Sequence, residues 1–355
     1  MGELRLMKGN EAVAEAAIRA GADAYFGYPI TPQSEVMEYL AAEEPHKRTG
    51  MVLLQAESEL GAINMVYGAA STGKKAMTSS SSPGISLMME GISYLAGSQL
   101  PCLIVNVVRG GPGLGTIQPS QADYFQATKG GGHGDYRIIV LAPSSVQEMS
   151  DFVKLGFELA FKYRMPAMML SDGLIGQMME KVELFDPIPR TTKFDQSWVT
   201  TGKTPDRECN VISSLDLDPY GMEKHNQELQ AKYREVVKNE VRYELIDCDD
   251  IDYLLVAYGS SARICQKAVK LAREKGIKVG LIRPITLYPF PYKKIEELGA
   301  KVRGILSVEL NAGQMVEDVR LAVGSKVPVQ HFGRLGGVVH SPEEVIEALE
   351  KNYIK

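Results

Sequence analysis

The sequence lacks any long uninterrupted apolar segment. No stretch approaches the roughly 20 uncharged apolar residues that a membrane-spanning helix requires, and the N-terminal residues MGELRLMKGNEAVAEAA contain no apolar signal core. Positive charge is also scarce, because 39 Lys and Arg stand against 44 Asp and Glu and no long basic run occurs. The formal net charge is −5. We therefore expect a cytoplasmic protein that binds neither a membrane nor nucleic acid.

Cysteine and histidine are rare and scattered. The four cysteines, Cys102, Cys209, Cys248 and Cys265, lie far apart in the sequence. None belongs to a C-x-x-C pair or to the cysteine run that binds iron–sulfur clusters. The five histidines show no H-E-x-x-H or similar spacing. We expect reduced cysteines and no metal site on this chain.

The apolar residues that are present predict an α/β protein. The chain has 355 residues, of which 45% are hydrophobic, so two domains are expected. Short apolar strands such as PCLIVNVV and MPAMMLS alternate with helical patterns in residues 1–185. Residues 186–249 form a polar connector with one amphipathic helix, and the alternation resumes in residues 250–355. This pattern predicts two doubly wound domains with mostly parallel sheets.

Several residues are typical of helix ends. Asn10 is predicted to cap a helix that ends at Gly21, and Thr31 with Pro32 is predicted to open the next helix. Ser341 begins SPEE, the pattern of a capping box, at the start of the last helix.

The segment GAASTGKKAMTSSSSPG, residues 68–84, resembles part of a phosphate-binding loop. Gly68, Gly73 and Lys74 fit G-x-x-x-x-G-K, but Lys75 occupies the position of the required hydroxyl. The residues before Gly68 read as a helix, whereas a phosphate-binding loop follows a strand. We favour a helix that ends before Gly73 and keep a nucleotide-binding NTPase as an alternative.

The end of this segment, TSSSSPG, reads as a strand that passes into a helix N-terminus. Such a place can bind an anion, or the serines can simply cap the helix, and the sequence favours neither. In an open α/β sheet the ligand site lies beyond the carboxyl ends of the strands, which is where this loop falls.

Two charged residues follow other predicted strands. Arg109 stands between the strand LIVNVV and the glycine-rich GGPGLG, which suits binding of a carboxylate. Alternatively, Arg109 is a surface residue or pairs with Asp123 or Asp135. Glu59 follows the strand VLLQA and lies either in the site or merely at a favourable helix N-terminus.

Longer stretches resemble a known family. GADAYFGYPITPQSEVMEYLA, QAESELGAINMVYGAASTGKKAMTSSSSPGISLMMEG and LPCLIVNVVRGGPG closely resemble the α subunit of 2-oxoacid:ferredoxin oxidoreductases, and the resemblance runs nearly end to end. RGGPGLG followed by PSQADY is most like the 3-methyl-2-oxobutanoate (2-oxoisovalerate) type. This resemblance implies a thiamine diphosphate pyrimidine-binding domain in residues 1–185 and a transketolase C-terminal-like domain in residues 250–355.

The resemblance also implies roles for individual residues. Counting back from MVYGA identifies Glu59 as the acid that bonds the pyrimidine nitrogen, and Thr31 and Arg109 match the family's catalytic threonine and its carboxylate-binding arginine. The implied set is Glu59, Thr31, Pro29, Ser81 and Ser82 for the cofactor, and Arg109, Thr31 and Gln118 for the substrate. The 2-oxoglutarate type carries threonine where this chain has Gln118, which favours a branched-chain substrate over 2-oxoglutarate.

The implied reaction is oxidative decarboxylation of a 2-oxoacid to an acyl-CoA, with electrons passed to ferredoxin. A β subunit would hold the diphosphate and Mg²⁺, and a separate γ-type subunit and an iron–sulfur, ferredoxin-like subunit would complete the enzyme. The alternatives that remain are the same machinery acting on 2-oxoglutarate or pyruvate, and a non-catalytic scaffold.

Overall fold

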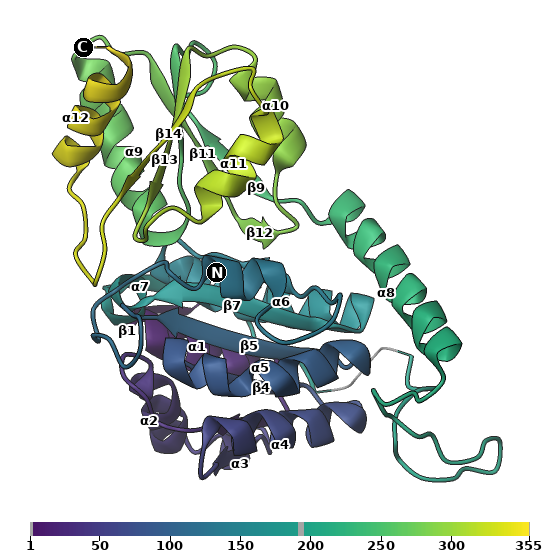
Figure 1. Cartoon of the computed structure of the whole chain (residues 1–355). Coiled ribbons are helices and arrows are strands. Elements are labelled where there is room, and N and C mark those ends of the chain that lie inside the picture. The colour runs from purple at the N-terminus through teal and green to yellow at the C-terminus, as the bar shows by residue number, and fades with distance from the viewer. Residues whose placement is uncertain (1–2, 191–194, 355) are drawn as a thin grey trace.

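The computed structural model describes residues 3–190 and 195–354, which form two sheet-and-helix units stacked one on the other (Figure 1). Both units contain a mostly parallel sheet with helices on its two faces. The prediction of an α/β fold with two doubly wound sheets is confirmed.

The first unit contains a seven-stranded sheet of order β12-β6-β7-β5-β4-β2-β3. The strands are β2 (Ala24–Gly27), β3 (Val52–Gln55), β4 (Ala76–Ser80), β5 (Cys102–Val108), β6 (Ile139–Leu141), β7 (Pro166–Asp172) and β12 (Thr286–Tyr288). Neighbouring strands are parallel except β12, which pairs antiparallel with β6. β5 is buried along its whole length, which explains its continuous apolar sequence.

Helices cover both faces of this sheet. Alternate residues of β5 belong to two apolar clusters, Ile104 with α4 and α5 and Leu103 with α1 and α6, so these helix pairs lie on opposite faces. The helices of this unit are α1 (Gly9–Arg19), α2 (Ser34–Glu43), α3 (Pro45–Arg48), α4 (Glu59–Ser71), α5 (Ser82–Gly97), the π-helical η1 (Gln126–Gly130), α6 (Val146–Tyr163) and α7 (Gly173–Gln177).

The second unit repeats this layering around a five-stranded sheet of order β14-β13-β10-β11-β9. The strands are β9 (Tyr243–Ile246), β10 (Tyr253–Val256), β11 (Val279–Pro284), β13 (Gly304–Glu309) and β14 (Val329–Gly333), and only β9 is antiparallel to its neighbour. Its helices are α9 (Gly259–Glu274), α10 (Tyr292–Gly299), α11 (Met315–Val323) and α12 (Pro342–Tyr353). One apolar cluster contains residues of both units, so their interface is a continuous core.

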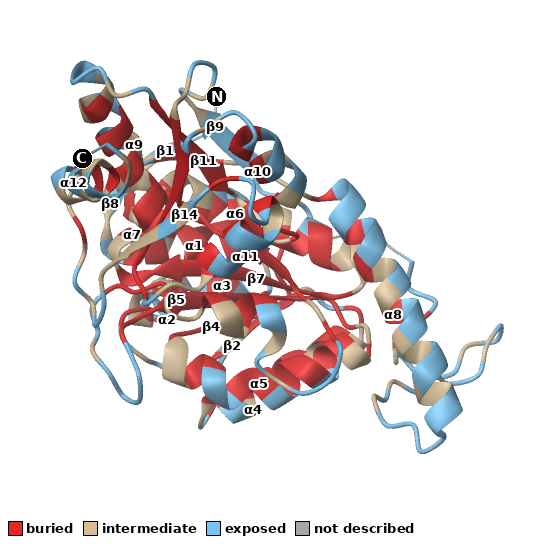
Figure 2. Ribbon diagram, turned by 45° about the horizontal axis from the view of Figure 1, so that its top comes forward, coloured by how far each residue is buried: buried red, intermediate tan, exposed pale blue. Residues whose placement is uncertain are grey.

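Outside these layers, β1 (Glu3–Lys8) pairs antiparallel with β8 (Met179–Leu184), and α8 (Pro219–Asn239) runs along the side of the molecule (Figure 1). α8 buries Leu229, Tyr233 and Val236, at the helical spacing that the sequence shows. Much of its surface and the loop before it are exposed, in contrast to the buried strands (Figure 2).

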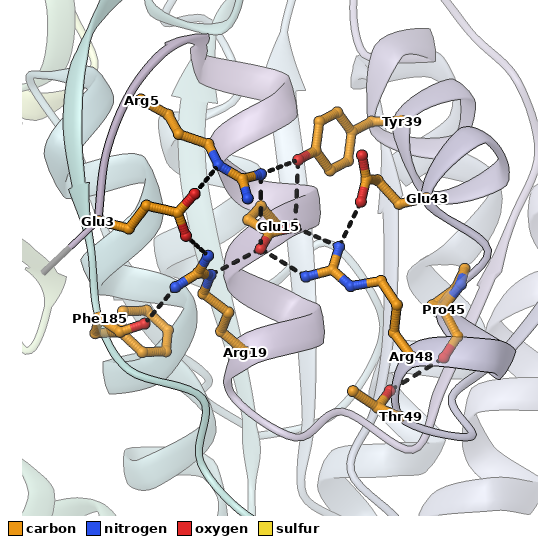
Figure 3. Close-up of polar contacts among 10 residues, drawn as sticks. All are labelled: Glu3, Arg5, Glu15, Arg19, Tyr39, Glu43, Pro45, Arg48, Thr49 and Phe185. Carbon is orange, nitrogen blue, oxygen red and sulfur yellow. Dashed lines mark hydrogen bonds and ion pairs between the residues drawn. The ribbon is translucent and has the colours of Figure 1, made fainter.

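A buried ion cluster joins α1, the α2–α3 region and β1 (Figure 3). Glu15 is fully buried, and its carboxylate accepts hydrogen bonds from Arg19 Nε at 2.7 Å and from both terminal nitrogens of Arg48 at 2.8 Å. Tyr39 donates to it at 3.2 Å, and Arg5 lies 4.0 Å away. Burial acts to raise the pKa of Glu15, but the hydrogen bonds from Arg48 and Arg19 outweigh it and hold the pKa below its ordinary value.

Two predicted helix starts are wrong. α1 begins at Gly9 with Lys8 as N-cap, and Asn10 instead donates its side-chain amide to the carbonyl oxygen of Pro32 at 2.7 Å. α2 begins at Ser34, beyond Thr31. The side chains of Asn10 and Gln177 both donate to the Pro32 carbonyl, so Asn10 is used in a tertiary contact and not as a helix cap.

Other predicted helix ends are confirmed. Gly21 follows α1 with a φ of +71°, and Gly73 follows α4 with a φ of +75°. Ser341 and Glu344 form the predicted capping box at the start of α12.

No helix in residues 3–190 and 195–354 is both long and apolar enough to cross a membrane. The same residues contain no group of three or more His, Cys, Asp or Glu side chains placed to hold a metal ion.

Candidate active site

Arg109 lies directly after β5, and its side chain is only 7% exposed. Nη1 donates to the carbonyl oxygen of Thr31 at 2.9 Å and Nη2 donates to that of Leu114 at 3.0 Å. Arg109 is therefore not a surface residue, and these bonds do not pair it with Asp123 or Asp135. They tie the loop after β5 to the loop after β2, and they engage only two of the five N–H donors of a guanidinium. Nε has no partner among the described residues.

The serine run lies where the sequence places it, between β4 and α5. Thr78, Ser80 and Ser81 are fully buried, and their hydroxyl groups have no hydrogen-bond partner in the described part of the chain. Ser81 is the N-cap residue of α5 but its side chain makes no capping bond. The capping account of this loop therefore fails for Ser81. Buried polar atoms are nearly always paired in proteins, so three unpaired hydroxyls at a strand end indicate a ligand site.

Ser82 connects this turn to Arg109. Its hydroxyl accepts a hydrogen bond from the Arg109 backbone amide at 3.1 Å, and its own amide donates to Asn106 Oδ1 at 3.2 Å. The first turn of α5 and the end of β5 are thus held together by a serine and an asparagine.

Glu59 is the first residue of α4, and Ser58 caps that helix by accepting a hydrogen bond from Gly61. Glu59 is 5% exposed. A Cβ atom at Gly84 would lie 2.4 Å from Glu59 Oε1 and 2.1 Å from Ser80 Oγ, so only glycine permits the first turn of α5 to approach this carboxylate. Glu59 therefore occupies a helix N-terminus and also faces the serine loop. Glu57, by contrast, is exposed.

The loop that carries Thr31 is held in place by hydrogen bonds of the Gln33 side chain. Gln33 is fully buried, accepts a hydrogen bond from Ser79 Oγ at 2.5 Å and donates to the Tyr28 carbonyl at 3.2 Å. Thr31 itself is exposed, as is Pro29 two residues before it. Thr31 contacts Arg109 through its backbone carbonyl rather than through its side chain.

Two cavities flank the Arg109 segment. One of about 720 Å³ is lined by Ser82, Arg109 and Asp123 from the first unit and by Asn311 and Gln314 from the second. The other, of about 670 Å³, is lined by Thr31 and Gln118 among others.

Gln118 is exposed, and the base of its side chain packs against the second unit, where a Cβ at Gly337 would lie 2.4 Å from Gln118 Cβ. The predicted residues are thus brought together around Arg109 in two groups, with Ser81, Ser82 and Glu59 at the α5 turn and Thr31 and Gln118 at the second cavity. The contacts described for the α5 turn do not include Pro29.

Sequence reasoning missed two residues of this site. Asn106 is fully buried within β5 and donates to Asp123 Oδ2 at 2.9 Å. The signal was present, because an asparagine within the apolar run LIVNVV needs a specific hydrogen-bond partner. Asp123 was considered only as a partner for Arg109.

The structure does not contain a phosphate-binding loop at residues 68–75. Gly68 lies within α4, whereas such a loop must follow a strand. Lys74 is 56% exposed and lies 3.8 Å from Asp23. The helix-end interpretation is confirmed.

Family models match both units of the chain. Residues 15–245 match the thiamine diphosphate-binding domain of pyruvate flavodoxin/ferredoxin oxidoreductases, and residues 251–345 match core domain II of pyruvate:ferredoxin oxidoreductases.

Curated relatives are similar over almost the whole chain. Ketoisovalerate oxidoreductase subunit VorB of Methanothermobacter thermautotrophicus is 48% identical over 98% of this chain and 97% of the relative. The 2-oxoglutarate synthase subunit KorA of Methanocaldococcus jannaschii is 38% identical over 98% of this chain and 99% of the relative.

Solved structures share the fold. The 2-oxoglutarate:ferredoxin oxidoreductase of Magnetococcus marinus, solved with 2-oxoglutarate, coenzyme A and succinyl-CoA bound, has a TM-score of 0.89 and 28% identity. The match covers 99% of this chain but only 65% of that longer chain. A split-gene transketolase has a TM-score of 0.61 at 14% identity, which shows the fold alone. The chain belongs to the 2-oxoacid:ferredoxin oxidoreductase family and is an enzyme subunit of the kind represented by VorB and KorA.

Proposed function

We propose that this chain is the subunit of a 2-oxoacid:ferredoxin oxidoreductase that binds the aminopyrimidine end of thiamine diphosphate and the carboxylate of a branched-chain 2-oxoacid. The observation that carries this proposal is Arg109, which is buried at a strand end, fixed by two backbone carbonyls and left with unused donors beside a cavity.

The α5 turn fits the pyrimidine end of the cofactor. A pyrimidine with ring nitrogens and an exocyclic amine needs a buried carboxyl group and hydroxyl partners. The turn offers Glu59 and the unpaired hydroxyls of Ser80 and Ser81, and Gly84 allows the first turn of α5 to approach Glu59 and Ser80 closely. When bound, thiamine diphosphate supplies the carbanion chemistry that cleaves the bond between the 2-oxo carbon and the carboxyl group.

Glu59 would hold the cofactor by sharing a proton between its carboxyl group and a pyrimidine nitrogen. Water is largely kept away from this carboxyl group, since Glu59 is 5% exposed. A hydrogen bond in such surroundings is electrostatically stronger than in water, and a positioned carboxyl group can transfer a proton repeatedly.

Arg109 would bind the substrate carboxylate through charge-assisted hydrogen bonds. Its bonds to the Thr31 and Leu114 carbonyls hold the guanidinium before substrate arrives, so little reorganisation accompanies binding. The same bond to Thr31 sets the position of the exposed loop that carries the threonine hydroxyl.

The cavity beside Arg109 supports a substrate with an apolar side chain. Its other lining residues include Pro83, Pro112, Leu310 and Leu335, and among the described residues that line it Arg109 is the one cation. A second substrate carboxylate would have no cationic partner there. The similarity to a ketoisovalerate oxidoreductase subunit supports the same choice.

Coenzyme A as acyl acceptor and ferredoxin as electron acceptor are part of this proposal. They are supported by the name of the Magnetococcus marinus enzyme and by its bound ligands. We assign the diphosphate and Mg²⁺ to a β subunit, and the remaining functions to a γ-type subunit and an iron–sulfur, ferredoxin-like subunit. This division is supported by the relatives' names, which describe them as subunits.

Anaerobic purification of the complex through a tag on this chain would test the proposal. We expect partner subunits and thiamine diphosphate to co-purify, and viologen reduction to require a 2-oxoacid and coenzyme A. A homo-oligomer without thiamine or activity would contradict the proposal and favour a scaffold.

A second candidate is the same reaction with 2-oxoglutarate. It is favoured by the KorA relatives, of which one is 38% identical to this chain. Comparison of kcat/KM for 2-oxoisovalerate, 2-oxoglutarate and pyruvate decides between them, and the largest value identifies the substrate.

A further inference from the structure

Asp123 lies on the wall of the cavity that Arg109 also lines. Its carboxyl group accepts a hydrogen bond from Asn106 Nδ2 at 2.9 Å. Burial raises the pKa of Asp123, against the opposing effect of the neutral Asn106 and Ser82 side chains. An acid that lines a cavity without an ionic partner among these contacts is costly, so its placement calls for a functional explanation.

A chain of hydrogen bonds runs from Asp123 through Asn106 and Ser82 to the Arg109 backbone. The Ser82 backbone amide can only donate, and it bonds Asn106 Oδ1, so the NH₂ group of Asn106 must point at Asp123. The Ser82 hydroxyl in turn accepts from the Arg109 amide at 3.1 Å and donates to the Arg109 carbonyl oxygen at 3.3 Å.

Asp123 acts on this chain of bonds through Asn106. Without the Asp123 carboxyl group, Asn106 loses the acceptor for its NH₂ group, and nothing on that side fixes the orientation in which its Oδ1 accepts from the Ser82 amide. Asp123 thus helps to set how the first turn of α5 holds the Arg109 backbone.

The second unit anchors the segment that carries Asp123. Gln121 is 2% exposed, and its side-chain oxygen accepts from Ser261 Oγ at 2.7 Å and from the Leu310 amide at 3.0 Å. Its side-chain NH₂ donates to the Tyr258 carbonyl at 2.8 Å. All three partners belong to the second unit, so Asp123 lies two residues from a residue that is anchored to that unit.

We propose that Asp123 is a positioning residue for the 2-oxoacid reaction, which through Ser82 and Asn106 fixes the Arg109 backbone so that the guanidinium meets the substrate carboxylate. This inference rests on the proposed function, because it needs Arg109 to bind the 2-oxoacid.

A double-mutant cycle in the purified complex tests the inference. The variants are Asp123→Ala, Arg109→Ala and the combination of both, assayed for KM and kcat with 2-oxoisovalerate. We expect Asp123→Ala to raise KM about tenfold, the size of one charge-assisted hydrogen bond, with a smaller change in kcat. In the Arg109→Ala background, Asp123→Ala should change KM less than about twofold, because residues that act through one contact are not additive.

Three controls keep the result interpretable. Asp123→Asn preserves the side-chain volume and one acceptor, so it should fall between wild type and Asp123→Ala, and it replaces the alanine variant in the cycle if that variant does not assemble. Asp135→Asn, at an exposed aspartate of the same region, should leave KM unchanged. Thiamine content and the thermal unfolding midpoint of each complex show whether assembly and cofactor binding persist.

Additive effects of Asp123→Ala and Arg109→Ala, or a wild-type KM in the Asp123 variants of an active complex, would overturn the inference and leave the proposed function standing. A wild-type complex without 2-oxoacid-dependent turnover would overturn the proposed function, and the inference with it.

Discussion

Two buried polar regions of the first unit differ in how their side chains are satisfied. Around Glu15, a fully buried carboxylate receives hydrogen bonds from Arg19, Arg48 and Tyr39 (Figure 3). Around the α5 turn, the hydroxyls of Ser80 and Ser81 and the Nε of Arg109 are buried without partners in the described chain.

The difference separates a structural site from a binding site. Leaving a buried polar group unpaired costs about 1–3 kcal/mol, so a region under selection for stability alone should resemble the Glu15 cluster. The α5 turn keeps unpaired groups together in one place, which is reasonable if a ligand pairs them. Substitutions in the two regions should therefore affect different measurements, activity at the α5 turn and stability at the Glu15 cluster.

The largest effect is expected from Glu59→Gln. The amide cannot share a proton with a pyrimidine nitrogen, so kcat should fall by about 10²- to 10⁴-fold, the usual contribution of a positioned acid–base group. The thermal midpoint of the chain should hardly move, because the residue is isosteric. Glu57→Gln, at the exposed acid two residues earlier, is the matched control and should retain activity. Equal losses in both variants would mean that the acid was assigned to the wrong position.

Arg109→Ala should lower kcat/KM for the 2-oxoacid, because a buried charge-assisted pair with the substrate is lost. The fall should correspond to about 2–4 kcal/mol of lost transition-state stabilisation. Steady-state kinetics across a substrate series measures this change. Arg109→Lys should recover only part of it, because an ammonium cannot reach both the Thr31 and Leu114 carbonyls as the guanidinium does. An unchanged kcat/KM in Arg109→Ala would remove Arg109 from substrate binding.

Glu15→Gln should act on stability instead. Removing one member of a buried ion cluster typically costs about 3–5 kcal/mol, and we expect about 2–3 kcal/mol because Arg5 and Arg48 are roughly one-third exposed. Denaturant unfolding of the purified chain measures the loss. Glu43→Gln removes the more exposed partner of Arg48 and should cost less than about 0.5 kcal/mol. A specific loss of kcat in Glu15→Gln complexes at full assembly would break the distinction between the two regions.

The sequence predicts the fold better than it predicts the contacts of the site. Continuous apolar runs such as β5 identify parallel strands, and the order of strands and helices places the ligand loops at one edge of the sheet. The position of Arg109 follows from that order. Its bond to the Thr31 carbonyl does not, because it joins residues 78 positions apart.

The errors have the same origin. Asn10 and Thr31 have the residue types of helix caps, but Asn10 is used in a long-range bond to the Pro32 carbonyl, and the two helices begin at Gly9 and Ser34. Local propensity is a weak guide wherever tertiary contacts compete for the same backbone groups. The role of Asp123 did not follow from the sequence for the same reason, since its hydrogen-bond partner Asn106 lies in another element, β5.

His340 lies outside the site and tests how burial of a side chain without hydrogen-bond partners makes stability depend on pH. Its side chain is 3% exposed and both ring nitrogens lack partners among the described residues. Burial lowers the pKa of His340 from 6.5 to about 4. Between pH 6.5 and 4 the unfolded chain therefore binds a proton that the folded chain does not, and stability falls as the pH falls, by up to about 3 kcal/mol.

Unfolding by denaturant at several pH values measures this dependence. His340→Phe should reduce the slope between pH 6.5 and 4, whereas His133→Gln, at an exposed histidine, should leave it unchanged. The same slope in His340→Phe as in wild type would show that other groups cause the loss of stability.

The smallest effects on stability are expected at two serines at helix N-caps, which allow the structural and the binding interpretation of a serine to be compared directly. Ser341 caps α12 by accepting a hydrogen bond from the Glu344 amide at 3.2 Å, whereas Ser81 precedes α5 without such a bond, and both helices have proline in the first turn. Ser341→Ala should cost about 1 kcal/mol, the usual value of a lost cap. Ser81→Ala should change the unfolding free energy by less than about 0.5 kcal/mol, because no bond is lost. If its hydroxyl serves the cofactor, the same variant should lose part of the thermal stabilisation that thiamine diphosphate gives to the assembled complex. The contrary outcome is that Ser81→Ala costs as much stability as Ser341→Ala and leaves the stabilisation by the cofactor unchanged. That result would show that the serine loop has a structural role, as the Glu15 cluster has.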